Sequence, residues 1–469
     1  MSARFDVAIL GGGPGGYVAA VRAAQLGLKV AVVEKDPKLG GTCLHRGCIP
    51  TKALLHYSDF YHSLSHCSSF GIKIEKASLD MEGVHKSKSK VVKRMAMGLD
   101  GLMKKNDISV IAGKGRLESA TRIVTDTGET IEANNVILAT GSVPVRLPLA
   151  EIDGKRVFTS DEILEHSQVP DTLIVMGAGA VGLEFACVYS DFGAQVEVVE
   201  MLDRALPLED EEISKELQKA FAKKGIKIHT STRVETVKTG KSGVTLTAQG
   251  PDGPVELKAE ALLMAVGRAP MLEGLGLEEL GVERAGRYLK VDQYYRTSLP
   301  NLYAIGDIVP GPQLAHVASA EGIVAVEHIA GHETRPIDYQ KIPSATYCKP
   351  EVASVGLTEA QAIEAGRTVK VGRFPWAALG KASIINETEG LVKIVADEEF
   401  GELLGVHIIG PHATDLIAEA CVALACEATV EELFRTVHAH PTLSEAIPEA
   451  AHGVFGQPIH LPPARRKRS

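Results

Sequence analysis

Two cysteines separated by four residues, Cys43 and Cys48, have the type and spacing that redox chemistry requires. They lie in the segment Gly40–Lys52, where glycines flank the first cysteine and Pro50 follows the second. Proline suits the first turn of a helix, so we expect Cys48 at a helix N-terminus, where the dipole and free amides favour a thiolate. Such a pair is suited to thiol–disulfide exchange. The alternatives are inert cysteines or a zinc site, and the latter would need two further ligands close by.

Another pair with identical spacing, Cys421 and Cys426, provides a comparison. It lies in alanine-rich helical sequence without glycine or proline, and five positions on a regular helix turn the second side chain well away from the first. We expect this pair to be inert, buried small residues. The seven cysteines are unlike a secreted disulfide framework and indicate a reducing compartment.

A histidine and a glutamate near the C-terminal end are candidates for proton transfer. A histidine is the natural base for a thiol near neutral pH, and a carboxylate can orient its ring. Between His440 and Glu445 lies a Pro-Thr turn that can bring the carboxylate back to the ring. His438, two positions earlier, leaves a metal-binding His-x-His fragment as the alternative.

Two glycine-rich turns predict two dinucleotide-binding units. In each, an apolar strand leads into G-x-G-x-x-G, a helix follows, and an acidic residue closes the next strand. The glycines allow a tight turn and close approach to a pyrophosphate at the helix N-terminus, and the carboxylate accepts hydrogen bonds from ribose. The residues are Gly11, Gly13, Gly16 and Glu34 in the first unit and Gly177, Gly179, Gly182 and Glu200 in the second. Glycines that only turn the chain are the structural alternative.

The identity of the second nucleotide follows from Glu200. A carboxylate at this position repels a 2′-phosphate, and the next residues, Met201–Asp203, contain no arginine. We therefore expect NAD rather than NADP.

The elements that position these residues follow from the order of the patterns. Strands alternate with helices through the first two thirds, which is typical of parallel α/β sheets. From Lys341 onward, the stretches Val352–Leu357, Gly390–Asp397 and Leu403–Ile409 alternate as antiparallel strands do, and a helix is predicted from about residue 414 to 426. The sequence predicts two dinucleotide-binding units and a third, α+β domain.

Bulk properties exclude several classes of protein. The net charge of −9 argues against a nucleic-acid partner, and no apolar run approaches the roughly 20 residues that span a bilayer. The basic run Arg465–Arg468 is predicted to be a solvated terminus, with a docking element for an acidic partner as the alternative. Phe5–Leu10 begins a strand too early for a signal peptide. We expect a cytoplasmic protein of bacterial type, with a mitochondrial matrix protein that has lost its presequence left open.

These motifs, in this order, resemble the pyridine nucleotide–disulfide oxidoreductase family over essentially the whole chain. Ala139–Gly141, Val266–Arg268 and Thr297–Asp307 add to the resemblance. It implies an α/β fold with two Rossmann-like dinucleotide-binding domains, the first for FAD and the second for NAD, and a C-terminal α+β dimerisation domain. The implied divisions are 1–147 for FAD binding, 148–270 for NAD binding, 271–340 as a return segment completing the FAD or central domain, and 341–469 as the interface domain.

The resemblance also implies roles for individual residues. The implied catalytic residues are Cys43, Cys48, Lys52, Glu184, His440 and Glu445. Cys43 exchanges with the substrate and Cys48 lies nearer the flavin, while Lys52 lies near flavin N5 with Glu184 as its partner beside the nicotinamide. The base His440, oriented by Glu445, serves the disulfide of the other subunit of a homodimer. His438 aligns with a position that has no catalytic role.

Cofactor contacts are implied in the same way, and no metal is expected. Those for FAD are Gly11, Gly13, Gly16, Glu34, Gly41, Thr42, Lys52, Gly115, Thr140, Gly141, Ser142, Asp307 and Ala315. Those for NAD are Gly177, Gly179, Gly182, Glu184, Glu200, Val234 and Gly267.

Within the family, His438–Ala446 and Gly177–Glu184 are most similar to the branch that oxidises dihydrolipoamide to lipoamide and reduces NAD. Its partners are the lipoyl domain and subunit-binding domain of a 2-oxoacid dehydrogenase complex, or the lipoyl protein of glycine cleavage. The chain departs from that branch at His45-Arg46, which adds positive potential near the disulfide and affects the thiol pKa or the choice of substrate. The alternatives are an NAD(P)H-dependent reductase of a non-lipoyl disulfide and a flavoprotein without disulfide turnover.

Overall fold

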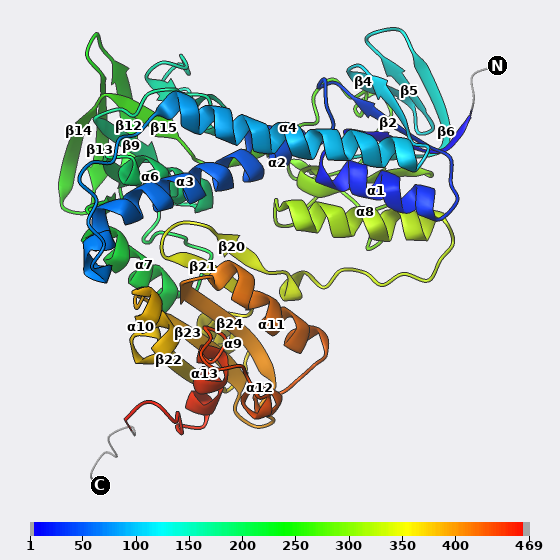
Figure 1. The fold of residues 1–469 in the computed structure, drawn as a ribbon. Coiled ribbons are helices and arrows are strands. Elements are labelled where there is room, and N and C mark those ends of the chain that lie inside the picture. Colours follow the sequence, from blue (N-terminus) through cyan, green and yellow to red (C-terminus); the bar gives the residue numbers. More distant parts are fainter. Residues whose placement is uncertain (1–3, 463–469) are drawn as a thin grey trace. The chain divides into compact units, whose positions relative to one another are not determined.

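The computed structural model describes residues 4–462 and divides into two compact units. The first unit comprises residues 4–54 together with Asp80–Val145 and Gly267–Asp338. The second comprises Leu55–Leu79, Arg146–Val266 and residues 339–462. Each contains a parallel sheet flanked by helices, and the second also contains an antiparallel sheet (Figure 1). The predicted α/β fold class with an additional α+β domain is confirmed.

The first unit is built on a sheet in the order β3-β2-β1-β6-β5-β4, with β19 also pairing with β6. Strands β3, β2, β1, β6 and β19 run parallel, and β4 and β5 are antiparallel additions. The bounds are β1 Phe5–Leu10, β2 Val30–Glu34, β3 Ser109–Ala112, β4 Gly115–Ser119, β5 Arg122–Thr125, β6 Thr130–Leu138 and β19 Leu302–Ala304. The central strands are apolar without alternation because both faces are buried.

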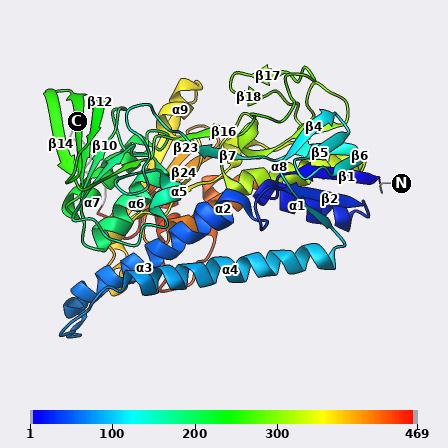
Figure 2. The ribbon, with the colours of Figure 1, turned by 90° about the horizontal axis from the view of Figure 1, so that it is seen from above.

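Helices pack against one face of this sheet and carry part of the candidate chemistry. Helices α1 and α8 pack against each other. The bounds are α1 Pro14–Gln25, α2 Gly41–Arg46, α3 Cys48–His66, α4 Met81–Lys105 and α8 Ala315–Ile329. Helix α4 begins at its N-cap Asp80, whose carboxylate accepts a hydrogen bond from the Gly83 amide at 3.1 Å. Figure 2 shows α4 as a long, straight helix of the first unit.

The second unit repeats the nucleotide-binding architecture. Its parallel sheet has the order β11-β10-β9-β15-β8, and a meander of β12, β13 and β14 follows β11. The strands are β8 Val157–Phe158, β9 Thr172–Met176, β10 Gln195–Val199, β11 Lys227–His229, β12 Arg233–Thr239, β13 Val244–Gly250, β14 Gly253–Ala259 and β15 Ala261–Met264. The helices are α5 Ser160–Ile163, α6 Ala180–Asp191 and α7 Glu211–Lys223.

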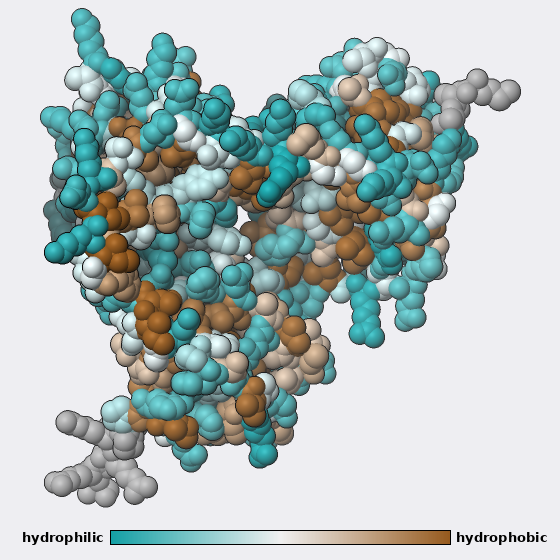
Figure 3. All heavy atoms as spheres, in the orientation of Figure 1, coloured by the Kyte–Doolittle hydropathy of each residue, from teal (hydrophilic) through white to brown (hydrophobic). Residues whose placement is uncertain are grey.

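The C-terminal part of the second unit is an antiparallel sheet in the order β20-β21-β24-β23-β22. The strands are β20 Ser344–Thr346, β21 Glu351–Gly356, β22 Val369–Pro375, β23 Leu391–Asp397 and β24 Leu403–Gly410, and the helices are α9 Glu359–Glu364, α10 Gly380–Ile385, α11 Ala413–Ala425, α12 Val430–Arg435 and α13 Ala446–Val454. Its core includes Trp376, whose indole N–H donates to the Ile409 carbonyl at 2.6 Å. Apolar side chains also reach its surface, including Val422 and Val437, and Figure 3 shows apolar patches over these elements.

A buried ammonium group connects the nucleotide-binding and C-terminal parts of the second unit. Lys393 on β23 lies 2.8 Å from a carboxylate oxygen of Asp210 and 2.8 Å from one of Glu359. Burial lowers the pKa of Lys393, but the hydrogen bonds to these two carboxylates raise it more, so the net pKa lies above its ordinary value. The ammonium therefore stays charged and holds the N-cap of α7 to the C-terminal sheet.

The cysteines of α11 correct part of the expectation. The helix ends at Ala425, one residue before the predicted end, and Cys426 forms its C-cap. Cys421 is half-buried, as its contact with the core requires, but Cys426 is exposed rather than buried. The prediction failed there because the helix end removes the neighbours that would cover the side chain.

The predicted return segment lies mostly in the first unit. Residues Gly267–Asp338 belong to the first unit, where β19 pairs with β6. We retain the division at 147, 270 and 340 as a proposal.

The basic run Arg465–Arg468 lies outside the described residues. In the part of the chain that the structure describes, no helix is long and apolar enough to cross a membrane.

Candidate functional site

The Cys43–Cys48 pair lies where helix α2 ends and helix α3 begins, in the first unit. Cys43 is on α2, and Cys48 is the first residue of α3, at the helix start that the sequence predicted. The Cys43 thiol is hydrogen-bonded to Cys48, and its pKa is raised first by that bond and then by burial, while the nearby Lys52 ammonium lowers it. Cys48 lies at the positive end of α3, where the helix dipole and the free amides favour a thiolate.

The residues between the cysteines are bound to the preceding loop. Arg46 lies 2.7 Å from an Asp36 carboxylate oxygen, and the Nε2 atom of His45 lies 2.9 Å from the Leu39 carbonyl oxygen. The positive potential expected from Arg46 is thus offset by Asp36. The two side chains anchor α2 to the segment that follows β2.

The first glycine turn has the geometry that a dinucleotide requires. The Glu34 carboxylate accepts hydrogen bonds from the amides of Gly12 at 2.7 Å and Asp36 at 2.9 Å. Gly11 has φ +107°, and a Cβ there would lie 2.3 Å from the Ala139 carbonyl oxygen. At Gly13 the nearest atom to an added Cβ would be 3.8 Å away, so the space beside this backbone is open and fits a pyrophosphate.

The second turn has the same pattern of carboxylate–amide hydrogen bonds as the first. The Glu200 carboxylate accepts hydrogen bonds from the amides of Ala178 at 2.7 Å and Leu202 at 2.8 Å. Gly177 has φ +105°, and beside Gly179 no atom lies within 4 Å of an added Cβ. The internal repeat of the sequence is therefore a repeat of structure, and both turns fit a dinucleotide.

A further group of predicted FAD contacts meets near the end of β6. Thr140 donates to the Met271 carbonyl at 2.7 Å, and the Ser142 hydroxyl donates to the Asp307 carboxylate. The Arg268 guanidinium donates to the Ser142 oxygen at 2.7 Å. The structure brings Ser142 and Asp307 together although 165 positions separate them.

The remaining predicted contacts occupy varied positions. Gly115 begins β4, where an added Cβ would lie 2.6 Å from Leu10, and Val234 on β12 packs against an apolar core. Packing explains both residues, and their cofactor contacts remain a proposal. The other positions are helix starts or turns: Gly16 in α1, Gly41 and Thr42 at the start of α2, Gly141 after β6, Gly182 in α6, Gly267 before β16 (Arg268–Pro270) and Ala315 at the start of α8.

Glu184 is buried on α6, and its carboxylate accepts the Tyr347 amide at 3.1 Å. Lys52 lies on α3, one turn after Cys48. The pairing of Lys52 with Glu184 stays a proposal.

The histidine and glutamate are close together, as the Pro-Thr turn predicted. The Nδ1 atom of His440 lies 2.9 Å from Glu445 Oε1, and the Thr442 amide donates to Glu445 Oε2 at 2.8 Å. Burial raises the pKa of Glu445, but the hydrogen bonds from Thr442 and His440 outweigh it and lower the net pKa. The His440 side chain is 78% exposed, so it is accessible to a second subunit. By contrast, both ring nitrogens of His438 are engaged, with Thr436 and Glu419.

One neighbour of the cysteines was missed from the sequence. The pKa of Tyr17 is raised, first by burial and then by the charge of Cys43, so the phenol lies near that sulfur. Its position directly after Gly16 in the glycine turn was the available signal.

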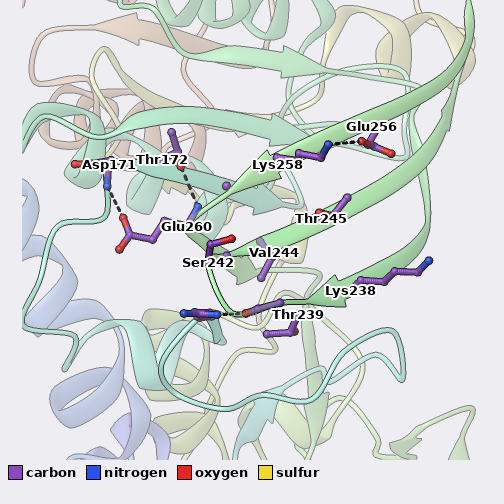
Figure 4. A pocket seen from close by; sticks show the side chains of 14 residues that line it. Asp171, Thr172, Lys238, Thr239, Ser242, Val244, Thr245, Glu256, Lys258 and Glu260 are labelled. Atoms are coloured by element: carbon purple, nitrogen blue, oxygen red, sulfur yellow. Dashed lines mark hydrogen bonds and ion pairs between the residues drawn. The ribbon is translucent and has the colours of Figure 1, made fainter.

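A polar hollow in the second unit lies away from the predicted nucleotide contacts (Figure 4). It is lined by the amino end of β9 and by β12–β14, including Asp171, Lys238 and Glu260. Dinucleotides bind at the carboxyl ends of parallel strands, where Gly177 follows β9, so this hollow is not the nucleotide site. Among the described residues, no group of three or more His, Cys, Asp or Glu side chains is placed to hold a metal ion.

Comparison with known proteins gives the class of the chain. Residues 5–322 match the family described as pyridine nucleotide-disulphide oxidoreductase, and residues 342–451 match the dimerisation domain of that family. The chain belongs to the pyridine nucleotide–disulphide oxidoreductase family. This membership confirms the predicted class of enzyme and the predicted cofactors, FAD and NAD.

Several individual proteins are similar to this chain over nearly its whole length. The chain is 46% identical to the dihydrolipoyl dehydrogenase of Bacillus subtilis over 98% of its own length and 100% of that protein. It is 43% identical to the mitochondrial dihydrolipoyl dehydrogenase of Pisum sativum over 97% of its length and 92% of that protein. Among solved structures, LpdA from Mycobacterium tuberculosis superposes with a TM-score of 0.88 at 30% identity, covering 95% of this chain and 99% of that one.

Proposed function

We infer that this chain oxidises dihydrolipoamide to lipoamide with reduction of NAD, through a redox-active Cys43–Cys48 pair and FAD. The observation that carries the inference is the hydrogen-bonded cysteine pair at the start of α3, in a unit whose glycine turn fits a dinucleotide. The similarity to dihydrolipoyl dehydrogenases, at 46% and 43% identity over 98% and 97% of the chain, supports the same substrate. Reduction of a non-lipoyl disulfide is the less supported alternative.

The reaction at the cysteines is a pair of thiol–disulfide exchanges. With the enzyme pair oxidised, one dihydrolipoamide thiol loses its proton to His440 and the resulting thiolate attacks the Cys43 sulfur. The Cys43–Cys48 bond breaks, and Cys48 leaves as the thiolate that its helix N-terminus stabilises. The second substrate thiol attacks the mixed disulfide, which closes lipoamide and leaves Cys43 reduced. FAD, when bound, supplies the route by which the electron pair reaches NAD.

We propose that Lys52 and Glu184 act at the contact between flavin and nicotinamide, and that Glu34 and Glu200 bind the two riboses. The carboxylates of Glu34 and Glu200 already accept two backbone amides each, which fixes their orientation before a nucleotide arrives. Fixed acceptors lose little entropy on binding.

The assembly that we propose is a homodimer, since residues 342–451 match a dimerisation domain. The exposed His440 then serves the cysteine pair of the partner subunit. We propose as further partners a lipoyl domain and the subunit-binding domain of a 2-oxoacid dehydrogenase complex, or the lipoyl protein of glycine cleavage. Bacterial and mitochondrial relatives favour the cytoplasm, or the mitochondrial matrix, as the compartment.

Steady-state kinetics test the proposed substrate. With dihydrolipoamide and NAD the purified holoenzyme should turn over at least roughly 10²-fold more efficiently than with glutathione and NADP, because the proposed substrate is a dithiol and the Glu200 carboxylate repels a 2′-phosphate. The measurement is kcat/KM for each pair. Preference for the second pair would overturn the proposal. Anaerobic dihydrolipoamide should also produce a long-wavelength thiolate–flavin band, and slow bleaching alone would indicate a flavoprotein without disulfide turnover.

Replacing Glu200 tests the choice of nicotinamide cofactor. Glu200→Arg removes the carboxylate that repels a 2′-phosphate and introduces a cation that attracts it, so the ratio of kcat/KM for NAD to that for NADP should fall by roughly 10–100-fold. The Lys238→Glu variant, altered on the exposed face of β12, should keep the wild-type ratio. An unchanged ratio in Glu200→Arg would place ribose recognition elsewhere.

A further inference from the structure

Helix α4 carries a row of exposed basic side chains, which we call the α4 basic stripe. Its members are Lys86, Lys90, Lys93, Arg94, Lys104 and Lys105. At about 100° per residue, these six positions project within roughly 120° of one another around the helix. The opposite side holds Ala96, Leu99 and Met103, which pack into the core of the first unit. The stripe is therefore the face that points away from the core.

The charges of the stripe are not neutralised within the chain. Within residues 4–462, no member of the stripe forms an ion pair, whereas Asp100 at its edge is bound to Lys38. Lys86, Lys90 and Arg94 follow one another at i,i+4, a spacing at which like charges destabilise a helix. Lys104 and Lys105 lie in the last turn, where the negative end of the helix dipole stabilises positive charge. The other four members of the stripe are too far from the C-terminus for this stabilisation. Repulsion within the stripe thus destabilises the helix, and no ion pair with the described residues offsets this repulsion.

The position of α4 connects the stripe with the candidate chemistry. Helix α2, which carries Cys43, contacts α4 in the same unit, and the Lys38–Asp100 ion pair joins α4 to the segment just before α2. A macromolecule bound along α4 therefore lies next to the element that holds the exchange thiol.

We propose that the α4 basic stripe docks the acidic protein domain that carries the dithiol substrate. The proposal rests on the proposed function, because it assumes a substrate thiol that reaches Cys43 while attached to a larger partner. The chain as a whole carries a net charge of −9, so an acidic partner is repelled by most of the surface and attracted at the stripe. The stripe thereby selects both the partner and its orientation, and it acts on association rather than on the thiol chemistry.

The test compares two double charge reversals in the holoenzyme. Lys90→Glu with Lys93→Glu alters the stripe, and Lys238→Glu with Lys241→Glu makes the same change on two exposed lysines around the β12–β13 hairpin. Each is assayed with a reduced lipoyl domain of net negative charge and with free dihydrolipoamide. The stripe variant should raise KM for the lipoyl domain by about ten-fold or more at low salt, with kcat unchanged. Its KM for free dihydrolipoamide should stay within about two-fold of wild type, as should both values for the control variant.

Several outcomes would overturn the proposal. One is an equal KM for the lipoyl domain in both double variants; another is an equal rise for the domain and for free dihydrolipoamide. Binding of a short DNA duplex that the stripe variant alone loses would assign the stripe to nucleic acid instead. A concentration-dependent change of oligomeric state in the stripe variant alone would assign it to a second copy of the chain. Activity with free dihydrolipoamide separates these failures from a failure of the proposed function.

Discussion

Replacing either Cys43 or Cys48 by serine should reduce dihydrolipoamide turnover by at least roughly 10³-fold while FAD remains bound. A serine hydroxyl can neither form the mixed disulfide nor accept its electron pair, so the exchange stops whichever sulfur is removed. The FAD contacts that we propose lie on other residues, so the flavin content should not change. Turnover and the absorbance of the bound flavin, measured on the same preparation, check both statements.

The two serine variants should differ from each other in their spectra. Cys43→Ser leaves Cys48 at the positive end of α3, where the thiolate is stabilised, so this variant should show a long-wavelength thiolate–flavin band. Cys48→Ser leaves Cys43 without its sulfur partner and should lack the band. Cys426→Ser is the matched control. It alters an exposed cysteine of the second pair with the same sequence separation, Cys421 and Cys426, and should turn over normally. Retained turnover in either active-site variant would refute the disulfide role.

Local patterns predicted the parts of the site whose geometry is set by nearby residues. Each glycine turn lies in one strand–turn–helix unit, and Glu34 and Glu200 close on amides 22 positions earlier in the same unit. The Cys43–Cys48 contact also depends on few residues, because Gly47 and the start of α3 bring the two sulfurs together. Sequence spacing is sufficient in these cases.

Contacts made by long side chains or by distant segments were beyond sequence reasoning. The charge of Arg46 was expected to act on the cysteines, but Arg46 forms an ion pair with Asp36 on the adjacent loop. This partner depends on the path of the chain after β2, which the sequence pattern does not predict. The amide of Tyr347 reaches Glu184 from 163 positions away. The exposure of Cys426 depended on a helix end one residue from its predicted place, a shift that periodicity does not resolve.

Replacing His440 by glutamine should lower the oxidation of dihydrolipoamide by roughly 10²–10⁴-fold, the range in which a general base contributes. The Glu445 carboxylate binds the Nδ1 side of the ring, which leaves Nε2 for the substrate thiol. Because the net pKa of Glu445 is lowered, this carboxylate is charged above that pKa and loses its hold on the ring only as the pH falls through it. Oxidation of NADH by an artificial acceptor does not require thiol deprotonation and should change little.

The controls for His440 come from the same segment and from the proposed dimer. His438→Gln removes a ring whose two nitrogens are bound by Thr436 and Glu419, so it should leave turnover largely intact. Mixing inactive His440→Gln and Cys48→Ser subunits should recover activity, since one site of each mixed dimer then combines an intact cysteine pair with an intact histidine from its neighbour. In His440→Gln, equal losses in the oxidation of dihydrolipoamide and in the oxidation of NADH by the artificial acceptor would rule out His440 as a base. Mixed dimers that stay inactive would mean that each histidine serves its own subunit.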